Sequence, residues 1–249
     1  MPSPLAALVA VVSAALDRSR DHFRGRDAVS VGVAVLLVGG VAVGTALGIV
    51  GLGLVFDATI DETVTVDNPD QPPEWVCESE VHGEESPVTA GCDRPDRIDV
   101  DVGAELRDAA AGLFHYGLIG VVVWWGVFAG VLHGGARIAG GNGSFADSLV
   151  VAAWAIVPEL LRVGIGLAVI GYALATADVG GGGFETIAAD VTAAIGGASG
   201  PLFAASVATV AIQWFVVVGG LEATHDLDRL TAGVLAGVFG GLLLASTAL

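Results

Sequence analysis

The sequence predicts an all-α membrane protein with five transmembrane helices. Of its 249 residues, 54% are hydrophobic and 15% are charged, whereas a soluble domain carries about 25% charged residues. The charges are gathered into polar blocks that separate long apolar runs. Segregation of this kind is typical of chains whose apolar runs cross a bilayer, and not of chains that bury one large soluble core.

The charge balance indicates an unusual environment. The formal net charge is −17, and all ten basic residues are arginine. Dense carboxylates keep a protein hydrated at very high salt, where their mutual repulsion is screened. We therefore expect a halophilic archaeon as the source; an acidic outer loop in an ordinary organism of high genomic GC content is the alternative. Because phosphate binding needs a basic face, we expect no nucleic acid partner.

Residues 1–27 form an N-terminal segment that we expect to be a cytoplasmic interfacial helix. The apolar run within Pro4–Phe23 is too short to span a bilayer. Arginines follow this run and can anchor the helix to headgroups: Arg18, Arg20, Arg24 and Arg26. A signal peptide carries its positive charge before the apolar run, so an uncleaved signal-like segment is the less favoured alternative.

Residues 28–249 form the five-span membrane domain, and its first span is Ala28–Phe56. This run contains no charge and exceeds the roughly 20 residues that cross a bilayer, so we expect it to tilt. Gly40, Gly44 and Gly48 recur every fourth residue. That spacing lets a second helix approach closely, although a generally glycine-rich composition explains it equally well.

An acidic extracellular loop, 57–108, is inserted between the first two spans and holds sixteen of the 27 acidic residues. Residues 59–67 and 97–102 alternate β-branched and polar side chains, which predicts the two strands of a hairpin. Cys77 and Cys92 lie between them, and outside the cell they are expected to form a disulfide, worth about 3 kcal/mol. The alternatives are a disordered acidic loop and two free thiols.

The second span is Leu113–Ala136. It carries another glycine series with four-residue spacing: Gly126, Gly130 and Gly134. His115 and His133 lie near its two ends, where an imidazole ring can reach water or headgroups. A proton-relay or metal role for either histidine is an alternative that no other residue at ligand spacing supports.

A short turn leads to the third span, Leu149–Thr176. We expect Asp147 or Ser148 to cap this helix, because a side-chain oxygen there satisfies an unpaired amide donor. Pro158 lies inside the span. It is expected to kink the helix and to free the carbonyl of Trp154, since proline removes one backbone hydrogen bond.

Three further helices complete the expected fold. Phe184–Ile195 can form a short amphipathic helix within a glycine-rich outer segment, and Pro201–Gly220 and Thr231–Leu249 are the fourth and fifth spans. The last span carries a third glycine series: Gly233, Gly237 and Gly241.

Arginine placement predicts the orientation of the chain. With a cytoplasmic N-terminus, the inner segments carry Arg18, Arg20, Arg24, Arg26, Arg137 and Arg229. The outer segments carry Arg94, Arg97 and Arg107, all in the long loop, where the positive-inside bias counts least. We therefore expect a multi-pass protein of the cell membrane with an extracellular C-terminus.

The main polar feature within a span is the pair Glu159 and Arg162, which follows Pro158 directly. A charge inside a bilayer costs about 2.5–3.5 kcal/mol, so the two side chains are expected to pair and to face the bundle or a wet cavity. The pair is a candidate site for an ion, a proton or a lipid headgroup; a structural ion pair between helices is the favoured alternative.

No catalytic, cofactor or metal site is expected. The sequence contains no phosphate loop, nucleophile elbow or HExxH motif. For intramembrane proteolysis, Ser206 and His115 are the nearest candidates for a serine–histidine pair, but they lie on different spans without supporting neighbours.

The residues after the second span resemble a known family. A turn of the form GG-x-GSF, a following helix with a proline, and an H-x-L inner loop before the last helix are similar to prokaryotic members of the Yip1 domain family. The first part is carried by Gly140, Gly141, Gly143, Ser144, Phe145 and Pro158, and the second by Trp214, Gly220, His225 and Leu227. The resemblance covers roughly Ala28–Leu249, with the acidic loop as an insertion.

The resemblance implies a five-span membrane protein and supplies no catalytic residues. Eukaryotic members of the family act in vesicle trafficking with Rab GTPases, which prokaryotes lack, so that role is not carried over. We expect a non-enzymatic protein that organises the membrane, other membrane proteins or copies of itself through contacts between glycine-rich helices. The alternative is a small transporter or channel that uses Glu159 and Arg162 beside Pro158.

Overall fold

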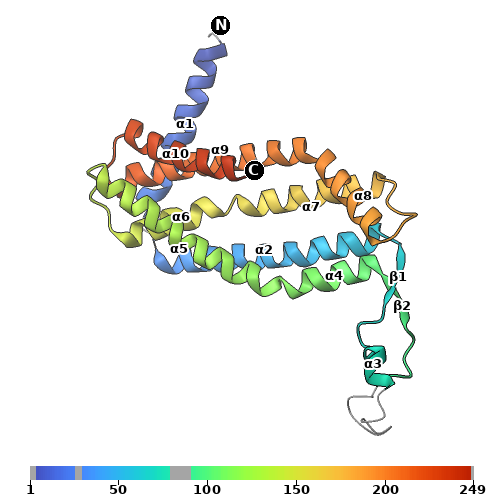
Figure 1. Cartoon of the computed structure of the whole chain (residues 1–249). Helices are drawn as coiled ribbons and strands as arrows, with labels where there is room; N and C mark the ends of the chain where they lie inside the picture. Colours follow the sequence, from blue (N-terminus) through green and yellow to red (C-terminus); the bar gives the residue numbers. More distant parts are fainter. Residues whose placement is uncertain (1–3, 26–29, 79–90, 248–249) are drawn as a thin grey trace.

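The computed structural model describes residues 4–25, 30–78 and 91–247, and most of them form one helical bundle (Figure 1). The helices are α1 (Pro4–Arg24), α2 (Val31–Thr59), α3 (Glu74–Cys77), α4 (Val102–Gly112), α5 (Phe114–Ile138), α6 (Phe145–Ile156), α7 (Glu159–Thr176), α8 (Phe184–Gly197), α9 (Ser199–Thr224) and α10 (Arg229–Thr247). The strands are β1 (Thr63–Asp67) and β2 (Arg97–Asp101).

The helix lengths confirm the predicted membrane bundle. Among the described residues, four stretches are long and apolar enough to cross a bilayer: Val31–Thr59, Val102–Ile138, Phe145–Thr176 and Ser199–Thr224. Two of these are composite, since α4 joins α5 and α6 joins α7. The shorter apolar helix α10 takes the place of the fifth predicted span. Many large apolar side chains remain exposed on the outside of the bundle, where lipid would cover them.

Helix α1 and the β-hairpin lie at opposite ends of the bundle (Figure 1). α1 crosses the end of α9 closely, because Gly219 lies directly against the Ser19 side chain and the Arg20 backbone. Leu16 and Phe23 of α1 are buried in the main core. The helix predicted for the N-terminal segment therefore exists, while its position on a cytoplasmic membrane surface stays a prediction.

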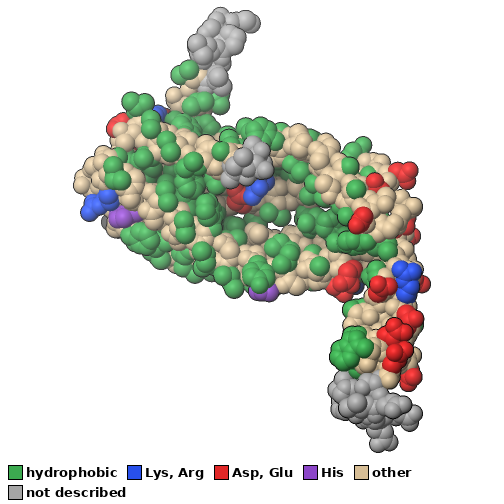
Figure 2. All heavy atoms as spheres, in the orientation of Figure 1, with side chains coloured by type: hydrophobic (Ala, Val, Ile, Leu, Met, Phe, Trp, Pro, Cys, Tyr) green, Lys and Arg blue, Asp and Glu red, His purple; other side chains and the backbone are tan. Residues whose placement is uncertain are grey.

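The hairpin and its disulfide are as expected. β1 and β2 pair antiparallel, with Thr63 opposite Asp101 and Asp67 opposite Arg97. Cys77 and Cys92 form a disulfide with Cα atoms 5.6 Å apart. Acidic side chains gather around this end of the molecule (Figure 2). Residues 79–90 of the acidic loop lie outside the described part of the chain, as do Arg26 and the predicted span ends at Ala28 and Leu249.

The acidic segment is shorter than expected, because both neighbouring helices extend into it. α2 continues to Thr59, and α4 begins at Val102, where the sequence suggested a loop as far as Asp108. Asp101 starts α4 by accepting a hydrogen bond from the Ala104 amide at 3.0 Å. α4 then packs along α2, since a Cβ atom on Gly103 would lie 2.5 Å from the Ile60 carbonyl oxygen.

The predicted cap of the third span was wrong. α6 begins at Phe145, and its N-cap is Ser144, not Asp147 or Ser148. The Ser144 hydroxyl accepts from the Asp147 amide at 3.2 Å, while the Asp147 carboxylate accepts from the Ser144 amide at 2.8 Å. This reciprocal capping box satisfies two amide donors at once, and Ser148 is thereby placed inside the helix.

Pro158 interrupts the third span, but the expected free carbonyl is absent. α6 ends at Ile156 and α7 begins at Glu159. At the break the Val157 amide donates to the Trp154 carbonyl at 3.4 Å. The tighter turn therefore occupies the acceptor that proline would otherwise leave unpaired, and this prediction was wrong.

Candidate functional site

The break at Pro158 places three polar side chains in the middle of the bundle. The Arg162 Nε donates to the Glu159 carboxylate at 2.6 Å, so the two predicted charges do form a pair. Gln213 of α9 donates its amide to the other Glu159 oxygen at 2.9 Å. Gln213 is buried, and among the described residues its Oε1 has no hydrogen-bond partner. The carboxylate is therefore held by two helices, α7 and α9.

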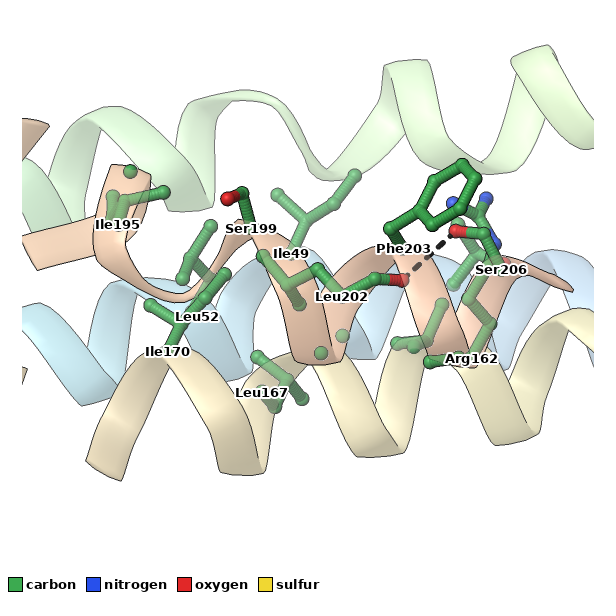
Figure 3. A pocket seen from close by; sticks show the side chains of 16 residues that line it. Ile49, Leu52, Arg162, Leu167, Ile170, Ile195, Ser199, Leu202, Phe203 and Ser206 are labelled. Atoms are coloured by element: carbon green, nitrogen blue, oxygen red, sulfur yellow. Dashed lines mark hydrogen bonds between the residues drawn. The ribbon is translucent and has the colours of Figure 1, made fainter. Parts of the chain in front are cut away.

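Two cavities meet at this polar group. The larger, of about 590 Å³, lies between α2, α7, α8 and α9 (Figure 3). The second, of about 470 Å³, lies between α2, α5, α6, α7 and α10. Thr45, Arg162 and Val163 line both. Figure 2 shows the bundle hollowed in its middle, with an acidic and a basic side chain at the margin.

A second polar cluster lies at the α1 end of the bundle, around His225. His225 and Ser148 are both fully buried, and their Nε2 and Oγ atoms are 2.9 Å apart. The Thr224 hydroxyl gives its only proton to the Gly220 carbonyl at 2.8 Å. The His225 Nδ1, which is 2.8 Å from the same hydroxyl, must therefore carry a proton and donate it. In the neutral ring Nε2 then accepts from Ser148, whose oxygen faces the His133 Nδ1 at 3.5 Å.

The glycine-rich turn before α6 lies directly against this histidine. The Asn142 amide donates to the His225 carbonyl at 3.0 Å. A Cβ atom on Gly143 would lie 2.6 Å from the His225 ring and 2.6 Å from the Thr224 carbonyl oxygen. Only glycine fits there, so the turn before α6 and the loop before α10 interlock.

The serine–histidine pair acts as a structural connection. Such a pair can activate a hydroxyl for nucleophilic attack when a substrate can reach it. Here both residues are fully buried, and neither lines either of the two cavities that meet at Arg162. The pair instead joins α6 to the α9–α10 loop, two segments 77 residues apart.

We expect stability to fall on acidification because of His225, which follows the end of α9. Burial lowers the pKa of His225 from its ordinary value of about 6.5. Below that pH the unfolded chain binds a proton that the folded protein does not, so the free energy of unfolding falls with falling pH until the lowered pKa is reached. Melting temperatures of detergent-purified protein between pH 8 and pH 5 test this. The variant His225→Gln should be less stable at pH 8 and should show a flatter pH dependence; an equal slope in both proteins would contradict the assignment.

The other predicted site residues are only partly brought together. His133 joins the His225 cluster, while His115 contacts Tyr116 with ring centroids 4.0 Å apart. The Ser206 hydroxyl donates to the Leu202 carbonyl of its own helix, and not to His115. Within the described residues, no group of three or more His, Cys, Asp or Glu side chains could hold a metal ion. Sequence reasoning missed two contacts: the one between Ser148 and His225, and the one between Gln213 and Glu159.

The three glycine series have different surroundings. Gly44 and Gly48 lie directly under Leu160 and Val163 of α7, whereas Gly40 has open space. Gly233 and Gly237 lie under the Trp214 indole, which a Cβ atom added at either position would meet at 3.4 and 3.9 Å, and Gly241 has no neighbour within 4 Å among the described residues. On α5, the whole series has no neighbour within 4 Å in the described structure: Gly126, Gly130 and Gly134.

The fold and these sites define a polytopic helical membrane protein whose last three spans are locked together by a glycine-rich turn and a buried histidine. The family model for the Yip1 domain matches residues 100–249. The match covers more than half of the chain, so the protein belongs to the Yip1 domain family. The match begins at residue 100, within β2, and thus covers less than the stretch from Ala28 that the sequence suggested. Comparisons with curated proteins and with solved structures give no match.

Proposed function

We propose that this protein organises the membrane without catalysing a reaction, by associating with a second copy through the outward face of α5. The observation that carries the proposal is the open glycine series. Glycines of the other two series lie against Leu160, Val163 and Trp214 inside the bundle, whereas those of α5 are left free in the described structure.

The α5 series lies opposite the face that packs in the core. At 100° per residue, Gly130 and Gly134 share one side of the helix with Val123 and Val127, and all four are exposed. Phe128, Ala129 and Leu132 point the other way and are buried. We refer to Val123, Gly126, Val127, Gly130 and Gly134 as the α5 glycine face.

A face of this composition suits a helix–helix contact in lipid. Small residues at four-residue spacing let two backbones approach, so that dispersion contacts and weak polar contacts form along several turns. The lipid chains that these contacts displace are as apolar as the valines, so association depends on close fit and not on the hydrophobic effect. A bulky side chain on the α5 glycine face should therefore abolish association between two copies.

The variant Gly130→Ile tests this proposal. Its side chain meets open space in the folded chain, so the fold is retained while the approach of a second helix is blocked. We expect energy transfer between donor- and acceptor-labelled copies in liposomes to fall to the level of random proximity. This corresponds to a loss of about tenfold or more in the affinity of one copy for another. Gly164→Ile on α7 is the matched control, because Gly164 is also exposed with open space around it. Energy transfer that Gly130→Ile leaves unchanged would refute association through this face.

A small transporter or channel is the second candidate, and the two cavities that meet at Arg162 favour it. Neutral replacement of both charges, Glu159→Gln with Arg162→Gln, should abolish a conductance or flux through liposomes. The same double variant should leave association through the α5 glycine face unchanged, so the two functions are separable.

We further propose that the protein resides in the cell membrane of a haloarchaeon with its N-terminus in the cytoplasm and its C-terminus outside. Support comes from the net charge of −17 with arginine as the sole basic residue type. It also comes from the placement of α1 and the disulfide-bonded hairpin at opposite ends of the bundle (Figure 1), because disulfides persist in oxidising compartments.

A further inference from the structure

The arginine in the middle of the bundle has donors that the protein does not use. A guanidinium group carries five N–H donors in a planar fork. The Arg162 Nε donates a hydrogen bond to Glu159. Its Nη1 and Nη2 make no hydrogen bond to a described residue. Figure 3 shows the side chain extending from α7 to the part of the larger cavity that Ser206 and Phe203 line.

The surroundings of those donors are apolar. Among the described residues that line the larger cavity, the polar side chains besides Arg162 are those of Thr45, Ser199 and Ser206. Its remaining walls are glycines and apolar side chains such as Leu167 and Ile170. A free guanidinium edge in an apolar cavity of about 590 Å³ fits a molecule with one anionic group and an apolar body.

We propose that the Arg162 cavity binds a membrane phospholipid, with the lipid phosphate on the Nη1 and Nη2 edge and the chains along α2, α7 and α9. The guanidinium fork matches two phosphate oxygens at once. Glu159 lies on the Nε side and is held there by Gln213, so it leaves the other edge open. A free phosphate ion would fill little of the cavity and would gain no apolar contact, which is why the lipid is favoured over a soluble anion.

This binding site goes beyond the association proposed above and does not depend on it. The larger cavity contains no residue of α5, and the α5 residues that line the second cavity are not those of the α5 glycine face. Loss of lipid binding and loss of association are therefore distinguishable results.

The test is the melting temperature of the detergent-purified full chain with added phosphatidylglycerol. We expect a concentration-dependent rise with phosphatidylglycerol, because a ligand that binds only the folded state stabilises it. Diacylglycerol, which lacks the phosphate, and inorganic phosphate, which lacks the chains, should each leave the melting temperature unchanged. An equal rise in melting temperature with inorganic phosphate would show a site for small anions. An equal rise with diacylglycerol would show that binding does not depend on a contact between phosphate and Arg162. Either result overturns the proposal.

Three variants locate the effect. Gly166→Leu places a bulky side chain in the larger cavity, where Gly166 has open space around it, and should abolish the response while leaving the Arg162 side chain in place. Gly164→Leu, two residues away and outside both cavities, should respond like the natural protein. Glu159→Gln removes the negative charge next to the guanidinium and should shift the response to lower phosphatidylglycerol concentration. An unchanged response in Gly166→Leu would overturn the assignment to this cavity.

Discussion

Replacing Gly143 by alanine is expected to lower the free energy of unfolding by about 3 kcal/mol. The added methyl group would lie 2.6 Å from both the His225 ring and the Thr224 carbonyl oxygen. One of these neighbours is backbone and the other is fully buried, so neither can move cheaply. The two loops that interlock at this point must separate, and the contact between Ser148 and His225 is lost with them. Denaturant titration of the two proteins in detergent measures the difference in the free energy of unfolding.

Gly164→Ala is the control for this substitution, since a methyl group there meets open space and alanine favours helix. It should not lower stability. The interlock is contradicted if Gly143→Ala unfolds at the same denaturant concentration as the natural protein.

Replacing Glu159 by glutamine is expected to lower stability by about 3 kcal/mol, because it leaves the Arg162 charge uncompensated within the membrane bundle. Gln213 would also lose a charged acceptor at 2.9 Å. The double variant Glu159→Gln with Arg162→Gln removes both charges and should recover most of the loss, since within a membrane bundle replacing both members of an ion pair is far less costly than leaving one charge without its partner. Unfolding of the two variants in the same detergent provides the comparison.

Another ion pair of the chain provides a matched control. Arg107 and Asp57 are 3.2 Å apart near the hairpin end, and both side chains are about one-third exposed. Asp57→Asn should cost no more than about 1 kcal/mol. If Glu159→Gln lowers the free energy of unfolding as little as Asp57→Asn does, the pair of Glu159 and Arg162 is hydrated like a surface ion pair. That result would contradict a water-excluded site in the middle of the bundle.

The elements that sequence reasoning predicted well are those set by local patterns. Long apolar runs with few or no charges define the spans, and alternating β-branched residues define the hairpin around the disulfide. The errors arose where a polar residue has a structural role. Ser144 and Asp147 cap α6 jointly, so this helix begins at Phe145 and not at Leu149, where the predicted span starts. The acidic residues of α4 suggested a loop, although Asp101 is the cap that starts this helix.

The candidate sites depend on contacts that one sequence cannot reveal. Glu159 and Arg162 are three residues apart, so helical spacing alone predicts their pairing. Gln213 is 54 residues from Glu159 and Ser148 is 77 from His225, and only the packing of α6 and α7 against α9 brings them together. Likewise, all three glycine series have the same spacing in the sequence, and only the structure separates the two used within the bundle from the open one on α5.

Cysteine scanning of α5 tests association through this helix most directly. The native cysteines are joined to each other and leave no free thiol, so single cysteines can be introduced from Ile119 to Gly134 without further changes. Under mild oxidation in native-like liposomes, we expect disulfide-linked dimers at Val123, Val127, Gly130 and Gly134, and few at Val122 and Trp124, which are exposed on the flanks of the helix. Dimers that peak at Val122 or Trp124, or that form equally at every exposed position, would show that the α5 glycine face does not join two copies.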